Sequence, residues 1–264
     1  MSNSRPARYE TRPLLDIIAE AVAVLRQDLG EYGYIALFGA VPATLAVVVP
    51  GVVGRPIALA FMAPLLVIVC VATFAASCAA FGSATNHLQP DAGSAYAAAA
   101  RRAFPLLKPW LLLVVALWMA SFVAATFVGY IDPVPHVVVP LILIVISAFY
   151  AFPRSLSASA MFDQDLSSRE AVAASAAIVR MQSGRVALAW GLALAPAIVV
   201  AALGMLAGFD TINASLAAFF FAGAMPFAAA MMSLLFSEAA TQIELAPATG
   251  QRAQAMPHVA RRRA

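Results

Sequence analysis

Six long apolar runs dominate the sequence. Each is long enough to cross a bilayer as a helix, which takes about 20 mostly apolar residues. The runs are Tyr34–Val53, Ile57–Phe81, Trp110–Ile131, His136–Phe152, Val186–Gly208 and Ile212–Phe236, and none contains Asp, Glu, Lys or Arg. Short connections separate the two runs of a pair, and longer charged connections separate the pairs. The pattern predicts an all-α transmembrane bundle of six spans.

A shorter segment that mixes polar and apolar residues precedes each pair of runs. The segments are Leu14–Asp28, Ser94–Phe104 and Ser167–Gln182. In the first, apolar residues recur at the spacing of one helix face; they are Leu14, Ile17, Ile18, Ala21 and Leu25. We expect the three segments to be amphipathic helices at the membrane interface, with their apolar faces toward the lipid.

Together these features predict three repeated units, each an amphipathic helix followed by a two-span hairpin. Arg26, Arg102 and Arg180 take equivalent positions in the leading segments, at separations of 76 and 78 residues. In the second run of each pair a proline precedes an aromatic residue by ten positions; the prolines are Pro64, Pro140 and Pro226. The units cover about 12–83, 91–153 and 165–244, and the third needs a gap to match. Convergence of hairpins in an alanine-rich chain is the alternative explanation.

Local signals predict where two of the leading helices begin or end. Ser167-Ser168-Arg169-Glu170 has the S-x-x-E pattern of a capping box. Gly30 and Gly184 stand where a glycine at a helix C-terminus is expected. We therefore expect the first and third leading helices to end at these glycines.

The basic residues are distributed unevenly around the spans. With six spans, fifteen of the sixteen Lys and Arg residues fall on one side of the membrane, and the short connections hold only Arg55. The positive-inside rule assigns that side to the cytoplasm. We therefore predict a multi-pass protein of the plasma (inner) membrane with both termini cytoplasmic. Residues 1–244 would form one transmembrane domain without a cleavable signal peptide, and 245–264 a disordered basic tail.

Composition narrows the functional classes. Hydrophobic residues make up 63% of the chain and charged residues 11%, against about 25% charged residues in soluble domains. An ordinary soluble protein and a nucleic-acid binder are therefore excluded as classes. The expected partners are membrane lipids, with a membrane-protein partner or a second copy of the chain as further candidates.

The sequence also resembles a known family in three places. These are Leu25-Arg26 before the first span, the stretch from Glu170 to Arg180 before the fifth, and the ending from Pro226 to Glu244. Over Leu14 to Glu244 the chain resembles bacterial six-span proteins that include the membrane domain accompanying some glycerophosphodiester phosphodiesterases. The resemblance implies an architecture and no activity, because the phosphodiesterase reaction belongs to a separate soluble domain.

No catalytic, cofactor or metal site emerges from the motifs. The three histidines have no metal-ligand spacing, and neither HExxH nor GxSxG occurs. A lipid-modifying enzyme would need acidic residues or histidines at headgroup level. Only Asp163, Asp165 and Glu170 come near this, and a solvated loop explains them. We expect no enzyme and no cofactor.

Two charged residues could connect hairpins. Arg154 and Glu238 follow the equivalent aromatic residues Tyr150 and Phe236 at the expected cytoplasmic boundary. An ion pair between them would lock two hairpins together, but separate solvation at the headgroups is the favoured interpretation.

The predicted function is a non-catalytic membrane scaffold or a module that binds lipids or a partner. Its working surfaces would be the cytoplasmic helices and a cavity between the hairpins. The alternative is a transporter or channel for a neutral or apolar solute, since no span carries an ionisable residue in its interior.

Overall fold

The computed structural model describes residues 12–53, 56–86, 88–102, 151–207 and 211–245, with isolated positions between 103 and 150. This part of the chain is helical and has no strand, as predicted. The helices are α1 (Leu14–Gln27), α2 (Leu29–Val53), α3 (Pro56–Thr85), α4 (Ala92–Arg101), the short 3-10 helix η1 (Phe152–Arg154), α7 (Ser157–Asp163), α8 (Ser168–Ala207), α9 (Thr211–Gly223) and α10 (Met225–Leu245).

Four segments of the described residues are helical, long enough and apolar enough to cross a membrane. They are Leu29–Val49, Leu65–Thr85, Ser168–Gly204 and Thr211–Thr241. They overlap the first, second, fifth and sixth predicted spans. The third and fourth predicted spans, Trp110–Ile131 and His136–Phe152, lie almost wholly outside the described residues.

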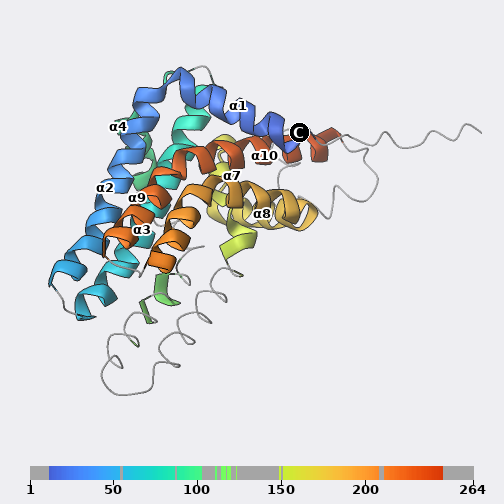
Figure 1. Ribbon diagram of the computed structural model, residues 1–264. Helices are drawn as coiled ribbons and strands as arrows, with labels where there is room; N and C mark the ends of the chain where they lie inside the picture. Colours follow the sequence, from blue (N-terminus) through green and yellow to red (C-terminus); the bar gives the residue numbers. More distant parts are fainter. Residues whose placement is uncertain are drawn as a thin grey trace, which may run out of the picture.

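The long helices form a bundle that is capped at one end (Figure 1). Helices α2, α3 and α9 pack side by side, and α10 packs along α3. Helix α1 packs against α10, α4 against α3, and α7 against α3, α8 and α10. We call the end of the bundle where α1, α4, α7 and residues 168–181 of α8 gather the capped end.

The core lies at the capped end. Its largest fully buried side chains come from α1, α2, α3, α8, α10 and the turn before α7; they include Ile17, Ile35, Phe81, Leu156, Ile178, Met231, Leu235 and Phe236. Farther along the spans, large apolar side chains are exposed instead, among them Val41, Leu45, Leu203 and Leu206. Exposed apolar surface of this extent is typical of a protein whose solvent there is lipid.

The apolar face of α1 packs against protein. Ile17 and Ala21 are fully buried in the core, and Leu14, Ile18 and Leu25 pack against the same cluster. The expectation that this face meets lipid is therefore wrong for α1. The spacing of the apolar residues predicted the buried face of α1 correctly, and α10 covers that face. The spacing cannot distinguish a protein neighbour from lipid.

The leading helices end before the predicted glycines. The backbone leaves helical geometry at Asp28 (φ −125°, ψ 45°) and, inside α8, at Gln182 (φ −128°, ψ 35°). Both residues have negative φ, so neither break needs glycine. Gly30 and Gly184 lie within α2 and α8 and have no positive φ. The predicted C-terminal glycines are therefore wrong by two residues.

The capping box at the start of α8 is confirmed. The Ser167 backbone N–H and hydroxyl donate to the Glu170 carboxylate at 3.1 and 2.6 Å, and the Glu170 N–H points back at the Ser167 hydroxyl at 3.5 Å. Helix α4 begins similarly, because the Ser94 N–H donates to the Asp91 carboxylate at 2.6 Å. That bond lowers the pKa of Asp91.

Two of the three prolines that recur in the repeats lie in described helices, at different positions. Pro226 is buried in the first turn of α10, directly after the break at Ala224. There its missing N–H removes no intrahelical bond. Pro64 lies inside α3, and Pro140 lies outside the described residues.

Candidate functional site

Helix α4 is fastened to the first pair of spans at the capped end. The Ala92 backbone N–H, at the start of α4, donates to the Glu31 carboxylate of α2 at 2.8 Å. The Tyr96 hydroxyl donates to the Ile35 carbonyl at 3.0 Å. Because burial raises the pKa of Tyr96, the hydroxyl keeps its proton and remains a donor. The same hydroxyl lies 3.4 Å from the Thr73 hydroxyl of α3, so α4 bridges α2 and α3.

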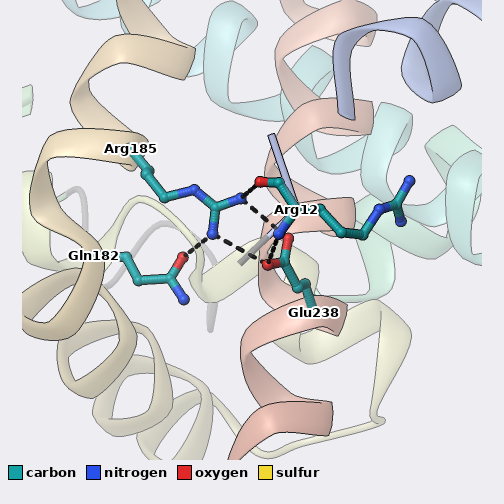
Figure 2. Close-up of polar contacts among 4 residues, drawn as sticks. All are labelled: Arg12, Gln182, Arg185 and Glu238. Atoms are coloured by element: carbon teal, nitrogen blue, oxygen red, sulfur yellow. Dashed lines mark hydrogen bonds and ion pairs between the residues drawn. The ribbon is translucent and has the colours of Figure 1, made fainter. Parts of the chain in front are cut away.

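A second contact fastens the N-terminal segment to the other side of the bundle (Figure 2). The Arg185 guanidinium of α8 donates to both carboxylate oxygens of Glu238 in α10, at 3.1 and 3.2 Å. It also donates to the Gln182 side chain at 3.0 Å and to the Arg12 carbonyl at 2.7 Å. The Arg12 backbone N–H donates to Glu238 at 3.2 Å. We call Arg12, Gln182, Arg185 and Glu238 the α1 latch.

The charged pair of the latch is largely removed from solvent. The side chains of Arg185 and Glu238 are 21% and 11% exposed. A guanidinium that contacts a carboxylate at two points is among the stronger ion pairs in proteins. The latch therefore joins three segments that are far apart in the sequence.

The Arg154–Glu238 pair stays a hypothesis. Glu238 accepts hydrogen bonds from Arg185 and Arg12. Arg154 is the last residue of η1 and is partly exposed. The sequence indicated that Glu238 joins separate segments, but it did not identify Arg185, because that pairing depends on how α8 and α10 pack. Exchanging the charges of Arg154 and Glu238 would test this pair.

The three repeated arginines do not share one environment. Arg26 and Arg180 stand two residues before the breaks at Asp28 and Gln182, and both are exposed. Arg102 stands at the end of α4, donates to the Met161 carbonyl at 2.7 Å and pairs with Asp165. Its guanidinium also lies 5.3 Å from the centre of the Phe162 ring. Arg102 therefore joins α4 to α7.

Sequence reasoning missed a buried carboxyl group. Asp163, the last residue of α7, was expected in a solvated loop. Both of its carboxylate oxygens are buried and have no hydrogen-bond partner among the described residues. Burial raises the pKa of Asp163 to about 7, and the Ser233 hydroxyl of α10 opposes that rise. The burial of Asp163 follows only from the packing of α7 on α3 and α10, because the sequence around it is polar.

Two open pockets lie on the described part of the molecule. One, of about 320 Å³, is apolar and lies between α2, α8 and α9; Leu37, Ala40, Pro196, Phe219 and Phe220 line it among others. The other, of about 330 Å³, has more polar walls between α3, α4 and α7, including Ser83, Asn86 and Ser94. Within the described residues, no three His, Cys, Asp or Glu side chains are grouped to hold a metal ion.

Comparison with known proteins gives no relative from which a function could be transferred. No family model, no curated protein and no solved structure matches the chain. The resemblance to the phosphodiesterase-associated membrane domains therefore stays a prediction.

Proposed function

We propose that the chain is a non-catalytic scaffold of the bacterial inner membrane, with six spans in three repeated units and the capped end in the cytoplasm. The observation that carries this proposal is a recurring contact between units. In each case the leading helix of one unit packs on the end of the preceding pair of spans. The pairs are α4 on α3, residues 168–181 of α8 on η1, and α1 on α10.

Two of these interfaces share a further detail. Glu31 and Arg185 each stand three residues after a helix break, at Asp28 and Gln182. Glu31 holds the first residue of α4, and Arg185 holds Arg12, just before α1. The contact of α1 with α10 would then close the three units into a ring around an axis along the membrane normal.

A closed ring at the membrane surface would give a rigid platform with a basic rim. Four of the exposed arginines at the capped end come from all three units; they are Arg26, Arg101, Arg169 and Arg180. Basic residues near an anionic leaflet contribute about 1 kcal/mol each to lipid binding. We infer that the platform gathers anionic lipid headgroups.

Native mass spectrometry tests this inference. The full chain would be placed in nanodiscs containing equal amounts of phosphatidylglycerol and phosphatidylcholine. We expect the retained lipids to be enriched in phosphatidylglycerol. Replacing the four arginines of the rim by glutamine should remove the enrichment, and replacing them by lysine should preserve it. Retained lipids that match the bulk mixture would contradict the proposal.

One observation favours the alternative, a carrier or channel for a neutral or apolar solute. The apolar pocket of about 320 Å³ between α2, α8 and α9 contains no charged lining residue. Flux of an uncharged solute into proteoliposomes, blocked by replacing Ala40 at the pocket wall with Trp, would favour this function over the scaffold.

A further inference from the structure

Helix α7 carries a carboxyl group into the core of the capped end. Asp163 ends the helix, and its carboxylate oxygen Oδ1 lies 3.5 Å from where a side chain on Gly82 of α3 would begin. Ser233 of α10 is fully buried, and its hydroxyl lies close enough to the Asp163 carboxyl group to oppose the rise in pKa that burial causes. The carboxyl group is thus enclosed by three helices.

The surroundings of Asp163 contain little to compensate a negative charge. Helix α3 offers the Cys78 thiol, which contacts Ser159 at 3.6 Å. At the end of α4, the Arg102 guanidinium already bonds Met161 and Asp165. The charged residues nearest in sequence on α8 are Arg169 and Glu170; the first is exposed and the second caps its own helix. The charged residue described on α10 near this level, Glu238, belongs to the α1 latch.

A buried carboxylate without partners is costly, whereas the neutral acid is not. We propose that Asp163 is a binding site for one proton, and that loss of this proton weakens the packing of α7 against α3 and α10.

The direction and the pH range follow from the difference between the packed and the released helix. A released, solvated Asp163 would have a pKa near its ordinary value of about 3.9, whereas burial raises it to about 7 in the packed state. Between these values the packed state binds more protons than the released state. The packing equilibrium therefore weakens about tenfold per pH unit as pH rises through this range, and it levels off above pH 7.

Hydrogen exchange of the full chain in nanodiscs tests the proposal. Exchange of peptides that cover α7 would be followed from pH 5 to pH 8 and divided by the intrinsic chemical rate at each pH. In the wild type we expect the opening equilibrium of α7 to rise about 50-fold from pH 5 to pH 7 and then to level off. Asp163→Asn should remove this dependence. Asp165→Asn, the same change at an exposed neighbour, should keep it.

Two results would overturn the proposal: a change of less than about twofold in the wild type, or an unchanged slope in Asp163→Asn. Should Asp163→Asn fail to fold, Ser233→Ala provides a second test. The Ser233 hydroxyl lowers the pKa of Asp163, so its removal should move the levelling-off point to higher pH. A levelling-off point that stays in place would also count against the proton site. Neither test depends on the proposed scaffold function.

Discussion

At the scale of single residues, Gly39 is the point where α2 and α3 approach each other closely. A methyl group built there would lie 2.2 Å from the Thr73 hydroxyl oxygen and 2.9 Å from the Thr73 Cβ atom. Rotating the Thr73 side chain cannot relieve the second contact, because Cβ does not move with χ1. The hydroxyl is also engaged, since it donates to the Val69 carbonyl at 2.8 Å.

We predict that Gly39→Ala destabilises the protein by about 1–3 kcal/mol, the usual cost of overpacking. Gly33 and Gly191 serve as matched controls, since each lies in a helix with open space around its Cα atom. Their alanine variants should be neutral or should stabilise by up to about 1 kcal/mol, because alanine favours helix. The free energy of unfolding of the three variants would be measured in mixed detergent micelles. Equal changes in all three would contradict a close approach of α2 and α3 at Gly39.

At the scale of helices, the α1 latch determines how firmly α1 is attached. Arg185 supplies the donors for Glu238 and for the Arg12 carbonyl. Its removal would leave the carboxylate of Glu238, whose side chain is 11% exposed when the pair is intact, with fewer donors. The cost of such a group is larger than that of a surface ion pair, since water replaces the lost partner poorly.

Arg185→Ala should therefore lower the free energy of unfolding by about 1–3 kcal/mol. It should also increase proteolytic cleavage within α1 in the folded protein. Glu20→Gln is the control, because it removes the exposed Arg12–Glu20 pair, and exposed pairs contribute about 0–1 kcal/mol. If protease cleaves α1 equally fast in both variants and their free energies of unfolding are equal, the latch does not hold α1.

At the scale of the whole molecule, we predict that the capped end faces the cytoplasm. Single cysteines would be introduced at Arg55 and at Arg180 in a chain whose Cys70 and Cys78 are replaced by alanine. In right-side-out vesicles, a membrane-impermeant maleimide should label the first cysteine at once and the second only after the membrane is opened. The opposite order would place the capped end outside.

Sequence reasoning predicted best what depends on neighbouring residues. The capping box of Ser167 and Glu170 follows from the local sequence and is confirmed. Four of the predicted spans overlap helices that are long and apolar enough to cross a membrane. The ends of the two leading helices were predicted at Gly30 and Gly184 but lie at Asp28 and Gln182. Glycine is only frequent at helix C-termini and is not required there. The neighbours of Ile17 and the burial of Asp163 were missed, since α10 covers both from more than 60 residues away.

The contact of α1 with α10 also has a consequence for how the protein is made. Arg12 is synthesised 226 positions before its partner Glu238. At about 5–20 residues per second, on the order of ten to fifty seconds separate their synthesis. During that time the apolar face of α1 has no α10 to cover it and needs a temporary neighbour, such as the membrane surface or a chaperone. Attachment of α1 then reports that translation has passed α10.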